Sequence, residues 1–360
     1  MTSKSENEVP LYCSDEESQE EVPQYVAAAV TTAGVIGGAY YAYRLQQAKK
    51  NKLPEKWNEV GYLKNLYLYP IKSVGPVILN QGECTELGMR DGRWLRDRHL
   101  MIVDAADNNF VTARGYPEML TIKPSINKAI LTLSHRDMES IDVNLAEVMV
   151  TQQPMQATVW GSPVQVYDCG EEVNKWITKF LNREGSSFRL VYYASQKSRP
   201  CVVPESMKIL FTKCRKTDIG AFPDQLSYNL ISETSVNDLN TRLNGTKVTV
   251  RNFRPNFHVV GINEPYVEEK WNYVKIGENV FQVVKTCTRC IMTNVDPETG
   301  IPIQSKEPMS KPLDALRSYR LIEDPEERKA AGDSPRLGIH LALRSGPGGN
   351  ISVNDRVYAA

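Results

Sequence analysis

Two cysteines three positions apart are the residues of this chain with the clearest capacity for chemistry. Cys287 and Cys290 flank an arginine, follow an apolar run at residues 280–284 that predicts a strand, and precede a turn signal at residues 296–300. A thiolate is a soft metal ligand, and a neighbouring guanidinium such as that of Arg289 favours the deprotonated thiol. The pair is therefore a candidate for metal binding or redox chemistry.

The spacing of this pair leaves three interpretations open. A zinc site would need further Cys or His ligands at regular spacing, but the chain has four scattered histidines and no second pair of cysteines. A thioredoxin-like dithiol would open a helix, whereas a turn follows here. Two structural thiols at the end of a strand need no other residues, and spacing alone favours that interpretation.

Basic residues in loops far from the cysteines are a second candidate feature, and it concerns anion binding. Lys72 and Ser73 follow a strand, Arg96 and Arg98 precede one, and residues 251–256 form an Arg/Asn loop fixed by a proline. Each feature alone is typical of a solvated surface. Together they could bind phosphate, which arginine contacts with two donors and lysine as a point charge. A thiolate and an anion-binding set suggest a phosphorylated metal cofactor.

Composition sets broad limits on the class of protein. The chain has 360 residues, with 43 basic and 43 acidic side chains, so its net charge gives no indication of a nucleic-acid partner. Seven cysteines are too few and too irregularly spaced for a disulfide framework. We therefore expect reduced thiols in a cytosol-facing protein.

The N-terminal region predicts a membrane anchor. Residues 1–24 are acidic and are expected to be disordered, and residues 26–43 contain no charge. A short signal anchor over residues 25–44 fits better than a cleaved signal, which needs a basic start, or a buried helix. Arg44 and several lysines follow the uncharged stretch, so the positive-inside rule would keep the body of the protein in the cytosol. Residues 45–60 are expected to be a linker.

Short strands separated by Gly, Pro and Asp signals dominate the body of the chain. Strands are predicted at residues 62–69, 77–79 and 99–103, continuing to about residue 167, and again at 338–343, 350–353 and 355–358. Helices are predicted at residues 171–181, 232–243 and 310–319, with Ser232 and Ser310 as N-caps, and residues 194–220 are predicted to be a long surface loop. The pattern indicates a β-rich α+β protein, with a barrel-like sheet and helices on its outside.

The order of several motifs resembles that of MOSC-domain proteins, and most of all the mitochondrial amidoxime-reducing components. The motifs lie at residues 69–73, 97–98, 111–114, 252–256, 289–300 and 306–308, within a resemblance that runs from about residue 61 to residue 358. The resemblance implies an N-terminal β-barrel-like domain over residues 61–183 and a MOSC β-barrel over residues 184–360.

The resemblance also implies a cofactor and its ligands. Molybdenum would be held by the dithiolene of molybdopterin, with the Cys290 thiolate as the protein ligand of the metal. The pterin and its phosphate would be bound by Lys72, Ser73, Arg98 and Arg254, and the metal would be lined by Thr288 and Arg289. Cys287 is not expected to be a ligand.

The activity implied is reduction of N-hydroxylated compounds such as amidoximes and hydroxylamines. Electrons would come from NADH through cytochrome b5 reductase and cytochrome b5, at the cytosolic face of the mitochondrial outer membrane. Two alternatives are a sulfur carrier related to molybdenum-cofactor sulfurases, which usually pair this domain with a pyridoxal-phosphate domain, and a non-catalytic membrane adaptor. The tail after Arg336 and the loop at residues 194–220 depart from the family pattern and leave the substrate range open.

Overall fold

The computed structural model describes residues 53–200, 202–346 and 348–360, and residues 54–360 form one compact unit. The predicted acidic tail and signal anchor lie outside the described residues. Within the described ranges, no helix is both long enough and apolar enough to cross a membrane.

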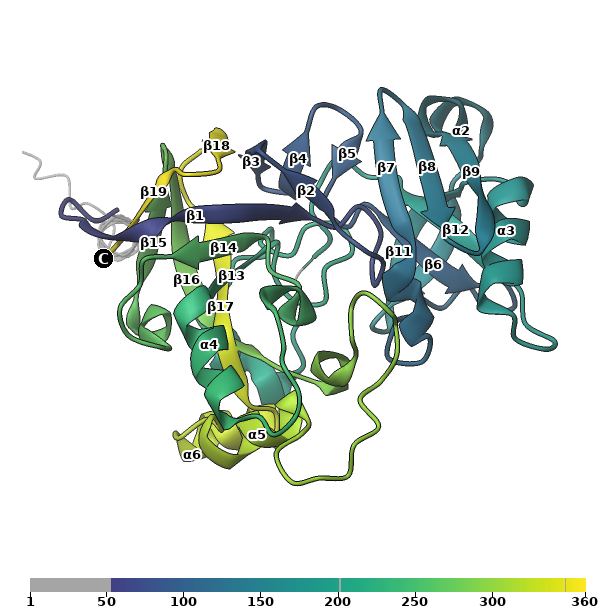
Figure 1. Ribbon diagram of the computed structural model, residues 1–360. Helices are drawn as coiled ribbons and strands as arrows, with labels where there is room; N and C mark the ends of the chain where they lie inside the picture. The colour runs from purple at the N-terminus through teal and green to yellow at the C-terminus, as the bar shows by residue number, and fades with distance from the viewer. Residues whose placement is uncertain (1–52, 201, 347) are drawn as a thin grey trace, which may run out of the picture. The chain divides into compact units, whose positions relative to one another are not determined.

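Seven strands form a closed barrel, which confirms the prediction of a β-rich protein built on a barrel (Figure 1). The order is β14-β13-β17-β16-β15-β19-β1, and pairing of β1 with β14 closes the ring. Only β13 and β14 pair in parallel. The strands are β1 (Asn58–Leu68), β13 (Tyr228–Ser232), β14 (Phe257–Val260), β15 (Tyr273–Ile276), β16 (Asn279–Thr288), β17 (Arg336–Leu343) and β19 (Arg356–Ala359).

The interior of the barrel is filled by apolar side chains from alternating positions. Tyr228, Phe257 and Phe281 are fully buried, and their ring centroids lie 5.1 to 5.5 Å apart. Leucine, isoleucine and valine side chains from every barrel strand join this cluster. Because closed pairing leaves no free edge among these strands, the barrel is a rigid base for the loops at its ends.

The remaining strands extend the barrel sheet or form three smaller sheets. Strand β2 (Val77–Leu79) pairs with β1. The small sheets are β10-β11-β12-β6, β18-β3-β4-β5 and β7-β8-β9. Their bounds are β3 (Gln81–Thr85), β4 (Gly88–Asp91), β5 (Leu95–Arg96), β6 (Leu100–Asp104), β7 (Lys123–Asn127), β8 (Ile130–His135), β9 (Met138–Asn144), β10 (Met155–Val159), β11 (Ser162–Asp168), β12 (Phe188–Tyr193) and β18 (Asn350–Ser352).

The three predicted helices are present, with one correction. Helix α3 (Glu171–Leu181) has its predicted bounds, and α4 (Glu233–Arg242) is capped by the Ser232 hydroxyl, which accepts from the Ser235 amide at 3.4 Å. Helix α5 (Pro312–Tyr319) begins after Lys311, so Ser310 is not its cap. The Ser310 hydroxyl instead donates to the carbonyl of Glu307 at 2.7 Å.

Two helices and five 3₁₀ turns were not predicted. Helix α2 (Leu145–Thr151) is capped by Asn144 and α6 (Pro325–Ala331) by Asp324, so both carry cap signals in the sequence. Figure 1 shows α4, α5 and α6 together on one side of the barrel. The 3₁₀ turns are η1 (Pro117–Thr121), η2 (Glu205–Phe211), η3 (Val250–Phe253), η4 (Val267–Lys270) and η5 (Ile291–Asn294).

Candidate functional site

A cavity of about 650 Å³ lies where loops from the barrel and from the smaller sheets meet. All seven predicted site residues line it: Lys72, Ser73, Arg98, Arg254, Thr288, Arg289 and Cys290. They come from four segments that are distant in the sequence. The structure thus brings the whole predicted set together.

Three of these residues have a left-handed backbone. The φ angles of Ser73, Arg98 and Arg254 are 65°, 49° and 53°. Non-glycine residues rarely adopt such angles, and strained backbone gathers at functional sites. Each of the three lies next to a regular element: Ser73 five residues after β1, Arg98 between β5 and β6, and Arg254 directly after η3. The loops are therefore bent sharply at the points where their polar side chains meet the cavity.

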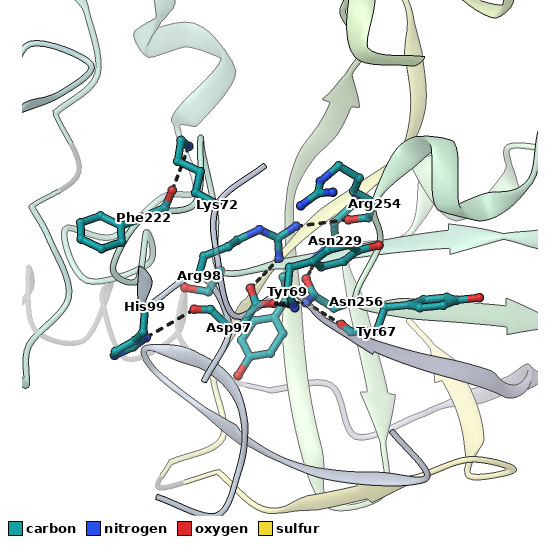
Figure 2. A network of polar contacts seen from close by, with 12 residues as sticks. Tyr67, Tyr69, Lys72, Asp97, Arg98, His99, Phe222, Asn229, Arg254 and Asn256 are labelled. Carbon is teal, nitrogen blue, oxygen red and sulfur yellow. Dashed lines mark hydrogen bonds and ion pairs between the residues drawn. The ribbon is translucent and has the colours of Figure 1, made fainter. Parts of the chain in front are cut away.

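The buried carboxylate of Asp97 holds these loops together (Figure 2). It accepts from the backbone amide of Tyr69 at 2.9 Å and from the side-chain amide of Asn256 at 3.1 Å. Its second oxygen forms an ion pair with Arg98 at 2.5 Å. Arg98 in turn donates to the carbonyl of Arg254 at 3.3 Å. One acidic side chain thus links three cavity loops and fixes one guanidinium.

Two guanidinium groups lie against the ring of Tyr69, as Figure 2 shows. The guanidinium carbons of Arg98 and Arg254 are 4.6 and 4.2 Å from the ring centroid. The buried Nη2 of Arg254 has no hydrogen-bond partner in the described residues. Burial lowers the pKa of Arg254 to about 10, with the charge of Arg98 acting in the same direction. An anion bound here would accept from the unpaired donor of Arg254 and offset the positive charges of both guanidinium groups, so it would stabilise this part of the cavity.

Lys72 is already paired on the opposite side of this network. Its ammonium donates to the carbonyl of Phe222 at 2.9 Å and forms an ion pair with Asp224. Burial lowers the pKa of Lys72, and the charge of Asp224 opposes that effect. Within the predicted set, Arg254 is therefore the cation with the greatest unused capacity for an anion.

The sequence-based prediction omitted three charged residues of the cavity, Arg114, Arg199 and Asp224. The Asp224 carboxylate accepts from Arg114 at 3.0 Å and from the indole of Trp160 at 3.2 Å. Burial raises the pKa of Asp224, but the charges of Lys72 and Arg114 outweigh burial and hold it below its usual value. The motif at residues 111–114 was the available signal for Arg114, and no comparable pattern marks Asp224.

The two cysteines of the opening motif differ in environment. Cys290 is partly exposed, two residues after the end of β16 and directly before η5, whereas Cys287 is buried within β16. Burial raises the pKa of the Cys287 thiol in spite of the nearby charge of Arg289. Burial acts to lower the pKa of the Arg114 guanidinium. The neighbouring Asp224 and Cys290 have the larger combined effect, so the pKa of Arg114 is raised. Cys290 is thus the more accessible sulfur, and its cationic neighbour is Arg114.

Arg289 lines the cavity, but its guanidinium faces the protein. Its Nε donates to the carbonyl of Leu337 at 2.7 Å and its Nη1 donates to the carbonyl of Phe253 at 2.9 Å. These bonds join the end of β16 to β17 and to η3. Arg289 therefore positions the Cys290 turn relative to the Arg254 turn.

The donor set fits a metal that arrives with its own anionic ligand. Among the described residues, no group of three or more His, Cys, Asp or Glu side chains is placed to hold a metal ion. The cavity offers one partly exposed thiol, Cys290, and a buried guanidinium with an unpaired donor, Arg254. A thiolate for a soft metal and N–H donors for a phosphate match a phosphorylated metal cofactor.

Comparisons with known proteins agree over most of the chain. Residues 60–184 match the model of the MOSC N-terminal beta barrel domain and residues 219–358 that of the MOSC domain. The chain is 34% identical over 331 residues to "Mitochondrial amidoxime-reducing component 1" of Mus musculus, covering 92% of this chain and 90% of that protein. It is 34% identical to the Homo sapiens protein of the same name, with 92% of both chains covered. It is also 34% identical to "Mitochondrial amidoxime reducing component 2" of Bos taurus, with 93% of both covered.

Proposed function

The chain belongs to the MOSC-domain family that includes the mitochondrial amidoxime-reducing components, and we propose that it is a molybdenum-cofactor-dependent reductase of N-hydroxylated compounds. The substrate class is amidoximes and hydroxylamines. One observation carries the proposal: a partly exposed thiol and a buried guanidinium with an unpaired donor line the same cavity. That combination suits a metal held by a phosphorylated organic cofactor.

Each predicted site residue has a role in this proposal. Cys290 would be the protein ligand of molybdenum, with Thr288 and Arg289 beside it. Arg254 would bind the phosphate of molybdopterin through its unpaired donor, and Arg98, Lys72 and Ser73 would complete the binding of the pterin. When bound, the cofactor would supply the two electrons that cleave the N–O bond of the substrate.

The protein would contribute positioning and charge. The ion pair with Asp97 fixes the position of the Arg98 guanidinium, and the hydrogen bonds of Arg289 fix the Cys290 turn to the barrel. Arg114 would place a positive charge beside the sulfur of Cys290 that binds the metal. Asp224 forms ion pairs with both Lys72 and Arg114, so its one negative charge offsets part of the positive charge at that end of the cavity.

Electron supply and location complete the proposal. Electrons would pass singly from NADH through cytochrome b5 reductase and cytochrome b5. The relatives carry "Mitochondrial" in their names, and a signal anchor over residues 25–44 would hold the enzyme in the mitochondrial outer membrane with its catalytic part in the cytosol. The proposal that the chain holds a molybdenum cofactor depends neither on these electron donors nor on the membrane.

Metal analysis of the purified full-length protein tests whether the chain holds a molybdenum cofactor. We expect about one molybdenum per chain, together with NADH-dependent reduction of benzamidoxime when cytochrome b5 and its reductase are added. Molybdenum without reduction of benzamidoxime or hydroxylamine, but with a persulfide on Cys290 detected by mass spectrometry, would favour the sulfur-carrier alternative. Protein that binds neither molybdenum nor sulfur would refute the proposal.

A further inference from the structure

One short segment of the chain contributes six apolar side chains to the cavity, and these have no role in holding a phosphorylated cofactor. It consists of residues around η2, and its cavity-lining side chains are Val202, Val203, Pro204, Met207, Leu210 and Phe211. A phosphate and a pterin need hydrogen-bond donors and acceptors, which none of these side chains offers. These six side chains form an apolar wall. The wall is therefore available to a different, apolar ligand in the same cavity.

The segment containing η2 is held closed at its base, contrary to the expectation of a plain surface loop at residues 194–220. The backbone amide of Arg199 donates to the carbonyl of Gly220 at 2.8 Å, and its side chain donates to the carbonyls of Ala221 and Pro223 at 3.1 and 3.0 Å. At the same base, two residues before Gly220, Asp218 forms a buried ion pair with Arg344 of the segment after β17 at 2.8 Å. The base of the loop is therefore fixed to the segment that follows a barrel strand.

The η2 turn itself is seated by packing. Leu210 is buried, and η2 lies against α6 and β16. The ring of Phe211 lies 5.1 Å from the ammonium of Lys285, which donates to Gln225 at 2.9 Å. Met207 and Phe211 are only half-buried, so their remaining apolar surface faces the cavity. A methionine and an aromatic ring held in this way form an adaptable apolar surface.

We propose that Val203, Met207 and Phe211 select substrates whose N-hydroxylated group is attached to an apolar, planar body. This inference rests on the proposed function, because it places the reacting group toward Cys290 and the body of the substrate on η2. Small polar hydroxylamines would lack this contact. The wall thus determines substrate range and not the chemistry.

Paired variants on the same short turn test this role. Met207→Gln keeps the length of the side chain and makes it polar, and Ile209→Gln is the matched control because Ile209 does not line the cavity. We expect Met207→Gln to raise the KM for benzamidoxime about tenfold, the scale of losing one apolar contact in a pocket. The KM for acetamidoxime, which has a methyl group in place of the ring, and both kcat values should stay within about twofold. Met207→Leu should restore wild-type KM values.

A binding measurement separates failure of this inference from failure of the proposed function. Calorimetry of benzamidoxime with the oxidised holoenzyme, without electron donors, should show a Kd about tenfold weaker for Met207→Gln than for Ile209→Gln. If the wild type reduces both amidoximes and the two variants behave alike, the wall does not select substrates and the function stands. If the wild type reduces neither amidoxime, the proposed function is wrong. Equal binding of benzamidoxime by the two variants, or no binding by either, would also refute the role of the wall in substrate selection.

Discussion

The side-chain amide of Asn256 donates to the buried carboxylate of Asp97 at 3.1 Å, across 159 positions of sequence. Asn256 precedes the barrel strand β14, and Asp97 lies between β5 and β6, outside the barrel. The same carboxylate binds Tyr69 and Arg98. The cavity therefore depends on one acidic residue that joins segments from two parts of the fold.

Asp97→Asn should destabilise the whole protein. Removing the charge leaves the Arg98 guanidinium without its ion pair in a largely buried place, a loss of about 3 to 5 kcal/mol in the free energy of unfolding. Urea unfolding followed by circular dichroism measures the loss. Asp91→Asn, at an exposed position of β4, is the control and should change little. Equal stability of the two variants would show that Asp97 does not hold the loops together.

Cys290→Ala should remove molybdenum and abolish reduction of benzamidoxime, and its thermal transition should match that of the cofactor-free wild type. Cys287→Ala is the matched control, because Cys287 lines the same cavity but is buried and its pKa is raised by burial. That variant should keep its metal and most of its activity. Metal analysis and turnover on the same preparations decide between the sulfurs. Molybdenum retained by Cys290→Ala and lost by Cys287→Ala would reverse the assignment.

Local patterns predicted the elements better than the cavity. Helix α3 was found at its bounds because its apolar spacing is regular, and Ser232 was recognised as a cap. Helix α6 was missed because it buries no side chain and so lacks an apolar stripe. The predicted site residues were identified through motif order, yet the ion pairs of Asp224 join residues more than a hundred positions apart. Such pairing leaves no local pattern, so only the folded chain reveals it.

Arg254→Met should weaken cofactor binding and stabilise the cofactor-free protein. The variant removes a buried guanidinium whose Nη2 is unpaired, so the free energy of unfolding of the apoprotein should rise by about 1 to 3 kcal/mol. Molybdenum content should fall. Arg251→Met on the same η3 turn is the control for cofactor binding and should leave the molybdenum content unchanged, because Arg251 is paired with Glu298 and lies outside the cavity lining. An apoprotein destabilised by Arg254→Met would mean that this arginine supports the fold and not an anion.

Glu268→Gln should stabilise the protein above about pH 4.5, and the gain should be nearly complete once the pH has risen through about 7. Glu268 is fully buried, accepts from the Ser235 hydroxyl at 2.8 Å, and has its pKa raised to about 7, chiefly by burial, from 4.5. Because the folded-state pKa is raised, the contribution of the protonated group is complete below pH 4.5 and is lost as the pH rises through about 7.

The uncharged glutamine avoids that loss and can still accept from Ser235. The gain in the free energy of unfolding should be near zero at pH 4.5 and about 3 kcal/mol at pH 8, from about 1.4 kcal/mol per pKa unit. Urea unfolding at the two pH values measures it, with Glu264→Gln at an exposed site as the control. A gain that is the same at both pH values would show that packing, and not titration of the buried carboxyl, separates the variant from the wild type.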